Sequence, residues 1–131
     1  PPGHATLLSE FIEALGAEPI DFAAKTLCCG SYQILANPEA AQDVSATILQ
    51  AALNAGADAL VLSCPLCEFN LAKTQKKLLP QQKISQEVPV YYLTQLLALA
   101  LGIDESACRF DLNDPSSLEF LKCKNFAGAT A

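Results

Sequence analysis

The stretch ALVLSCPLC at residues 59–67 joins a continuous apolar run directly to a Cys-x-x-Cys pair. A short apolar run bounded by turn residues is typical of a strand that is buried on both faces of a parallel sheet. Pro65 suits the first turn of a helix, because its missing N–H would have no partner there. The stretch therefore predicts a strand at residues 59–63 and a helix that begins at the cysteines, with two thiols at the junction.

Helices and strands are expected to alternate on both sides of this stretch. Asn37 is a good N-cap and Pro38 a good first residue for a helix that closes near Gly56. Apolar spacing predicts a further helix before Gly16, and Thr94 is the expected N-cap of another that ends at Gly102. Other expected elements are strands at residues 18–22 and 88–92 and continuation of the Cys64 helix to residue 79.

This alternation predicts an α/β fold, a small open parallel sheet with helices on both faces. Three strands make a thin sheet, and the chain contains no methionine, so we expect it to be a fragment whose missing strand precedes Pro1. Residues 1–102 are the expected cysteine-rich module. Residues 103–131 form a C-terminal tail with one short helix near residues 116–122.

The composition excludes several functions. The formal net charge is −6, and the few basic residues argue against nucleic acid or an anionic membrane as a partner. The longest apolar run, residues 93–101, is too short for a transmembrane segment. Six cysteines among helical segments fit intracellular thiols better than a secreted disulfide framework, so we expect a cytoplasmic protein.

Two cysteine pairs are expected to meet at one end of the sheet. Cys28 and Cys29 follow the first expected strand, Cys64 follows the second, and the carboxyl ends of parallel strands share one crevice. Cys64 and Cys67 lie at a helix N-terminus, which favours thiolates. An adjacent pair is awkward for one tetrahedral zinc and suits a polynuclear cluster. A zinc-stabilised interaction domain, a metal-free dithiol redox site and inert packing thiols remain alternatives.

The segments Thr26-Leu27-Cys28-Cys29-Gly30 and Ser63-Cys64-Pro65-Leu66-Cys67-Glu68-Phe69-Asn70 resemble the cysteine-rich CCG module. This module occurs in the B-type subunit of heterodisulfide reductase and in related succinate, glycolate, glycerol-3-phosphate and lactate oxidoreductases. The resemblance covers residues 7–102 and is strongest to the second of two tandem modules.

The resemblance implies an oxidoreductase subunit with a [4Fe–4S]-type cluster, which is noncubane in the methanogen enzyme. Its ligands are expected to be Cys28, Cys29, Cys64 and Cys67, and its chemistry to be disulfide reduction or electron transfer. Implied partners are other redox subunits, containing flavin or iron–sulfur clusters, and a disulfide or small-molecule substrate. The protein is expected in the cytoplasm or at the cytoplasmic face of a membrane complex.

The remaining candidate residues lie outside the two motifs. The family has one further cysteine, whose place falls upstream of Pro1, so we expect this chain by itself to hold a cluster poorly. Cys108 and Cys123 are expected to be packing or adventitious thiols, and His4 a solvated side chain. Lys25, close to the cysteine loop, is a weak candidate for offsetting cluster charge.

Overall fold

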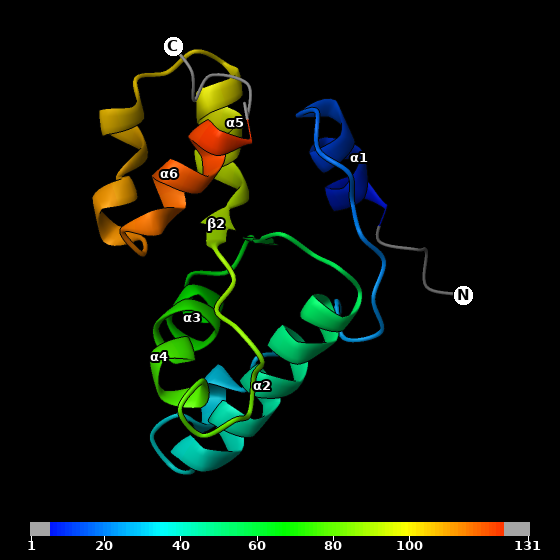
Figure 1. Ribbon diagram of the computed structural model, residues 1–131, viewed down its shortest axis with the longest axis vertical. Helices are drawn as coiled ribbons and strands as arrows, with labels where there is room; N and C mark the ends of the chain where they lie inside the picture. Colours follow the sequence, from blue (N-terminus) through cyan, green and yellow to red (C-terminus); the bar gives the residue numbers. More distant parts are fainter. Residues whose placement is uncertain (1–5, 125–131) are drawn as a thin grey trace.

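Two short parallel strands lie at the centre of the fold (Figure 1). The computed structural model describes residues 6–124. Strand β1 (Leu60–Leu62) pairs with β2 (Val90–Tyr92), with Leu60 opposite Val90 and Leu62 opposite Tyr92. The predicted strands at residues 59–63 and 88–92 are therefore confirmed, with shorter bounds.

Helical segments make up most of the remaining structure. In chain order they are α1 (Leu7–Ala14), the 3-10 helix η1 (Ser31–Gln33), α2 (Pro38–Asn54), α3 (Pro65–Glu68), the π-helix η2 (Phe69–Lys73), α4 (Gln75–Leu78), α5 (Leu93–Ala100), the 3-10 helices η3 (Glu105–Cys108) and η4 (Phe110–Leu112), and α6 (Ser116–Cys123).

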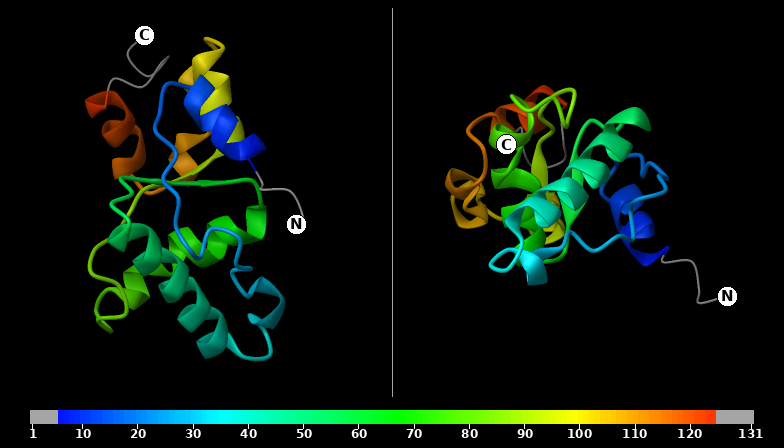
Figure 2. Two further views of the ribbon diagram at one scale, coloured as in Figure 1. Left: turned by 90° about the vertical axis from the view of Figure 1, so that its right-hand side faces the viewer. Right: turned by 90° about the horizontal axis from the view of Figure 1, so that it is seen from below.

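The two faces of the sheet are covered by different helices, as predicted. Leu60, Leu62 and Val90 pack in a first hydrophobic cluster with residues of α2, η2 and α4. Tyr91 belongs to a second cluster, with residues of α5 and α6, and Val61 packs against it. Figures 1 and 2 show α2, α3 and α4 on one side of the strands and α1, α5 and α6 on the other. Alternation along each strand thus divides the core into two.

The start of α2 follows the predicted capping. The side chain of Asn37 accepts a hydrogen bond from the backbone N–H of Ala40 at 3.1 Å, and Pro38 occupies the first turn. Both residues satisfy the local needs of a helix N-terminus. A long helix is thereby fixed directly after the Cys28–Cys29 loop.

The predicted strand at residues 18–22 is wrong. These residues have no regular secondary structure, and the described part of the chain contains only the two-stranded sheet. Pro19 cannot donate a ladder hydrogen bond, and Ile20 is 37% exposed. Phe22 packs against the first cluster without forming a strand.

The helix predicted for residues 64–79 is interrupted. It forms three successive segments, α3, η2 and α4, and the central one has π geometry. A π turn widens the helix and shifts the side chains that follow it, and such turns occur often at functional sites. The side chain of Asn70 is buried within this turn.

The predicted N-cap at Thr94 is wrong by two residues, because the helix begins at Leu93 and its N-cap residue is Tyr92. Helix α5 follows β2 directly, and the side-chain oxygen of Gln95 accepts from the backbone N–H of Tyr92 at 3.0 Å. Cys108, Phe110 and Leu121 place residues of the predicted tail in the second cluster. The short helix expected near residues 116–122 is α6. His4 lies outside the described residues.

Candidate functional site

The two cysteine segments meet beside the end of β1. The thiol of Cys67, on α3, donates to the sulfur of Cys29, and the two sulfur atoms are 3.2 Å apart. Cys64 is the N-cap residue of α3. The expected convergence is confirmed for one cysteine of each pair, although Cys29 comes from an irregular segment and not from the end of a strand.

The four motif cysteines differ in exposure. Cys29 is 1% exposed and Cys67 is half-buried, whereas Cys28 and Cys64 are exposed. All six cysteines of the chain are described and none forms a disulfide. Within residues 6–124, no group of three or more His, Cys, Asp or Glu side chains is arranged to hold a metal ion. Cys67 thus contacts the sulfur of Cys29 and is hydrogen-bonded to Cys64, whereas Cys28 lies apart from the other motif thiols of the described chain.

Cys64 and Cys67 have opposite electrostatic environments. Hydrogen bonds from the backbone N–H groups of Cys67 and Leu66 lower the pKa of the Cys64 thiol. Burial, together with the neighbouring Cys29 and Cys64, raises the pKa of Cys67 to about 12. The predicted thiolate preference at the helix start is therefore confirmed for Cys64 and wrong for Cys67 in the metal-free protein. The reason is that Cys67 is half-buried, and the cost of desolvating its thiolate outweighs the stabilising effect of the helix N-terminus.

Gly30 gives the cysteine loop its close contact with α2. Its φ is 78°, in the left-handed region that glycine adopts without steric cost. A Cβ at this position would lie 3.3 Å from the Cα of Ala41. Glycine thus permits both the turn after Cys29 and the approach of the loop to the helix.

Asn70 is the site residue that sequence reasoning missed. It is 1% exposed, and its side-chain nitrogen lies 3.1 Å from the carbonyl oxygen of Cys29 and 3.6 Å from the Cys29 sulfur. Its position three residues after Cys67 was part of the motif, but an interrupted helix could not be read from spacing. A buried amide beside a thiol is a strong polar feature.

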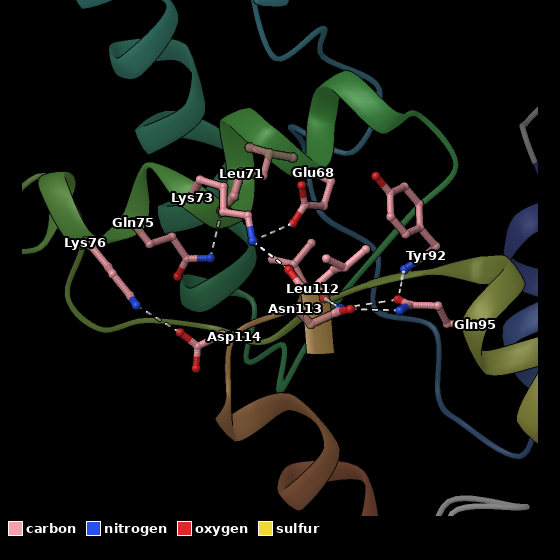
Figure 3. A network of polar contacts seen from close by, with 11 residues as sticks. Glu68, Leu71, Lys73, Gln75, Lys76, Tyr92, Gln95, Leu112, Asn113 and Asp114 are labelled. Carbon is pink, nitrogen blue, oxygen red and sulfur yellow. Dashed lines mark hydrogen bonds and ion pairs between the residues drawn. The ribbon is translucent and has the colours of Figure 1, made fainter. Parts of the chain in front are cut away.

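A polar network borders the site on the side of β2. Lys73 lies 3.4 Å from the carboxylate of Glu68 and donates to the carbonyl of Leu112 at 2.7 Å, as Figure 3 shows. Burial raises the pKa of Tyr92, with contributions from Glu68, Cys64 and Cys67. Tyr92 therefore lies close enough to the cysteines to respond to their charge.

The other predicted residues lie apart from the thiols. The ammonium group of Lys25 is 2.5 Å from the carboxylate of Asp21. Cys108 is buried in the second cluster and Cys123 is exposed on α6. In the described chain, neither of these two thiols contacts a motif cysteine.

The comparison with protein families matches residues 2–72 to CCG, the cysteine-rich domain. This match covers both cysteine pairs and more than half of the chain. The chain belongs to the CCG cysteine-rich domain family. The resemblance drawn from the two motifs is confirmed.

Curated relatives of this chain are subunits of redox enzymes. It is 33% identical over 100 residues to the 8-methylmenaquinol:fumarate reductase membrane anchor subunit of Wolinella succinogenes, covering 76% of this chain and 35% of the relative. It is 31% identical over 114 residues to the B-type subunit of the ferredoxin/F420H2-dependent CoB-CoM heterodisulfide reductase of Methanosarcina acetivorans, covering 86% of this chain and 38% of the relative. A protein of Archaeoglobus profundus that is similar to the same heterodisulfide reductase subunit is 31% identical over 105 residues, covering 79% and 35%.

The chain thus matches little more than a third of the length of these relatives. Within residues 6–124, no helix combines the length and the apolar character needed to cross a bilayer. The chain is a redox-related cysteine-rich module. The activity of a whole relative does not pass to it by similarity alone.

The donor set of this CCG domain fits an iron–sulfur cluster in kind. Thiolates are the ligands that such clusters take, and two segments 38 residues apart bring their sulfur atoms into contact. Two thiolates on one tetrahedral iron lie about 3.8 Å apart when each Fe–S bond is about 2.3 Å. The observed 3.2 Å contact is shorter than this spacing, and thiolates on separate irons of a cluster lie farther apart still, so the side chains of Cys29 and Cys67 would have to move apart to hold a cluster.

Proposed function

We propose that this CCG domain is an iron–sulfur redox module of an oxidoreductase that resembles the B-type subunit of heterodisulfide reductase. Cys28, Cys29, Cys64 and Cys67 are its proposed ligands, and the cluster is of the [4Fe–4S] type, cubane or noncubane. The observation that carries the proposal is the 3.2 Å contact between the sulfur atoms of Cys29 and Cys67. Two segments far apart in the sequence, each with a family motif, converge through their thiols.

The environment of each thiol supports a role in holding such a group. A bound cluster supplies one-electron transfer and a site for disulfide chemistry. Backbone hydrogen bonds lower the pKa of Cys64 and its side chain is exposed, so we expect it to take up iron first. Cys29 is buried and Cys67 is half-buried, which limits the access of water to the iron that they would hold.

The proposed partners follow from the relatives and from the surface near the cysteines. The relatives are subunits of redox complexes, so we propose partner subunits that carry flavin or iron–sulfur groups. Leu27 and Leu66, beside the two pairs, are 52% and 59% exposed and suit an apolar protein contact. Six free thiols suit a reducing compartment, and we propose the cytoplasm, including the cytoplasmic face of a membrane complex. Fractionation of cells that contain the full-length protein tests this location.

Anaerobic reconstitution tests the cluster proposal. The 131-residue chain is incubated with iron and sulfide, desalted, and analysed for iron, acid-labile sulfide and visible absorption. Cys29→Ser and Cys64→Ser should each lose most of the bound iron. Cys108→Ser and Cys123→Ser are the matched controls, because one removes a buried thiol and the other an exposed thiol outside the site.

Zinc provides the contrasting result for the same thiols. An iron–sulfur protein is brown, whereas a zinc protein is colourless. A chain that takes up one zinc per site but neither iron nor sulfide would instead be a zinc-stabilised interaction domain. Equal loss of iron in all four cysteine variants would contradict the proposed ligands.

A metal-free thiol–disulfide site is the second candidate. The contrast between Cys64, with its lowered pKa, and Cys67, with its raised pKa, favours it. The Cys64 thiolate would attack a disulfide, release one thiol, and leave a mixed disulfide that a neighbouring thiol resolves by releasing the second. Counting the free thiols of the metal-free chain after exposure to oxidised glutathione tests this. A loss of two thiols, mapped to the motif, would favour it.

A further inference from the structure

Asn70 connects the two cysteine segments through one buried amide. Its side-chain nitrogen lies 3.1 Å from the Cys29 carbonyl oxygen and 3.6 Å from the Cys29 sulfur. Asn70 is itself only 1% exposed, as is Cys29. An amide nitrogen carries two protons, so one can serve the carbonyl and the other the sulfur.

The orientation of this amide is determined by its partner. A carbonyl oxygen can only accept, so the atom of Asn70 that faces it must be the nitrogen. The opposite orientation would place two oxygen atoms against each other in a buried site. The donor role of Asn70 toward Cys29 therefore follows from the backbone of Cys29.

Ser45 is the other polar side chain near the Cys29 carbonyl, but it has another acceptor. Its hydroxyl lies 2.8 Å from the carbonyl of Ala41 and 3.4 Å from that of Cys29. A hydroxyl has one proton, and the shorter contact on its own helix uses it. Asn70 is thus the stronger donor to Cys29.

The π-helix gives Asn70 its position. Helix α3 carries Cys67, and the wider turn begins one residue after its end. Asn70 lies in this turn, and the hydroxyl of Thr74 donates to the Asn70 carbonyl. The segment that supplies Cys67 therefore also holds Cys29.

We propose that Asn70 is a positioning residue for Cys29. Its amide holds the Cys29 peptide and sulfur against Cys67, and in the cluster-bound protein it donates a hydrogen bond to the ligand sulfur. Hydrogen bonds to ligand sulfurs draw off negative charge, which stabilises the reduced cluster and raises its potential. The second of these effects rests on the proposed cluster function, whereas the first holds in the metal-free chain.

Alkylation of the metal-free 131-residue chain tests the first effect. The rate of iodoacetamide labelling is measured at each cysteine by peptide mass spectrometry. Asn70→Leu removes the donor, and Asn70→Asp keeps the shape but presents acceptors. Both should label Cys29 roughly tenfold faster, because one net hydrogen bond contributes about that factor to a local opening equilibrium.

Two controls make this result specific. Cys108, buried outside the site, should keep its labelling rate in both Asn70 variants. Ser45→Ala should change the rate at Cys29 by less than about twofold, since its hydroxyl mainly serves Ala41. An unchanged Cys29 rate in both Asn70 variants would overturn the proposal, as would equal acceleration at Cys108 in both or an equal effect of Ser45→Ala.

The potential of the reconstituted cluster tests the second effect. Asn70→Leu should lower the midpoint potential, with a roughly tenfold change in the ratio of reduced to oxidised cluster, or about 59 mV for a one-electron couple. Asn113→Leu is the matched control, since Asn113 donates to the Val90 carbonyl at 2.9 Å and lies beside Gln95 in the polar network of Figure 3. An unchanged potential in Asn70→Leu would overturn this effect. If no variant binds iron, the cluster function fails, while the alkylation rates still decide the role of Asn70.

Discussion

Cys29 and Cys108 are both buried thiols, one on each side of the sheet, and they have different neighbours. The sulfur of Cys29 contacts the thiol of Cys67 and the amide of Asn70. The sulfur of Cys108 lies 3.9 Å and 3.8 Å from the backbone carbonyls of Gln95 and Asp104. Burial of a cysteine is therefore no sign of function by itself, because a thiol also packs as a small hydrophobe. The groups around the sulfur distinguish the two cysteines: a thiol and an amide surround that of Cys29, and two backbone carbonyls that of Cys108.

The buried amides on the two sides show the same difference. On the side of α5, the amide of Gln95 donates to the carbonyl of Cys108 at 2.9 Å, and Asn113 donates to that of Val90 at 2.9 Å. These bonds join the tail to α5 and to β2. On the other side, Asn70 uses the same chemistry to hold a cysteine that faces another thiol. The buried amides on the side of α5 thus stabilise the backbone, whereas Asn70 on the other side holds a cysteine next to a second thiol.

The largest difference between the two sides should appear in iron binding. Cys29→Ser should reduce the iron affinity of the reconstituted chain by more than roughly tenfold, since losing a ligand costs at least as much as losing a residue that supports one. Cys108→Ser should leave it unchanged. Iron titration of both variants under anaerobic conditions measures this. Equal iron binding by the two variants would remove the distinction between the thiols.

Core truncation should affect both sides alike. Leu49 in the first cluster is 0% exposed and Leu99 in the second is 1% exposed. Replacing either with alanine should lower the free energy of unfolding by about 2–5 kcal/mol. Because the two strands are shared by both clusters, we expect one cooperative transition in urea, followed by circular dichroism. Two separate transitions would show that the sides unfold independently.

Glycine substitution should affect the cysteine side more. Gly30 and Gly102 both have positive φ, 78° and 76°, so alanine is strained at either position. At Gly30 the new Cβ would also meet the Ala41 backbone at 3.3 Å, while at Gly102 nothing lies within 4 Å. We expect Gly30→Ala to cost about 2–3 kcal/mol and Gly102→Ala about 1 kcal/mol. Urea midpoints measure the difference, and equal costs would mean that the loop yields freely.

Within the cysteine side, Cys64 and Cys67 should differ in the pH dependence of their alkylation. Backbone hydrogen bonds lower the pKa of Cys64, so its thiolate forms at lower pH in the folded metal-free chain than in the chain unfolded by urea. Burial raises the pKa of Cys67 to about 12, so its labelling should begin at higher pH when folded. Site-resolved alkylation from about pH 6 to about pH 10, a range that brackets the ordinary pKa of a thiol, measures both. Profiles that do not change on unfolding would contradict this assignment.

Local signals in the sequence predicted much of the scaffold. The Asn37 cap, Pro38 in the first turn of α2 and the strand before Cys64 each depend on a few neighbouring residues, and each is found in the structure. The strand expected at residues 18–22 failed because a strand needs a partner for its hydrogen bonds. The local pattern of residues 18–22 could not reveal that no partner strand would lie beside them in the described chain.

The sequence by itself determined the helix boundaries that caps and prolines enforce, the alternation that covers both faces of the sheet, and the motif cysteines. Only the tertiary structure decided that Cys29 meets Cys67, that Cys64 and Cys67 have opposite pKa shifts, and that Asn70 is aimed at Cys29. The physical reason is range. Caps and turns are satisfied within a few residues, whereas burial, thiol contacts and the register of a π-helix depend on segments about forty residues apart that come together only when the core packs.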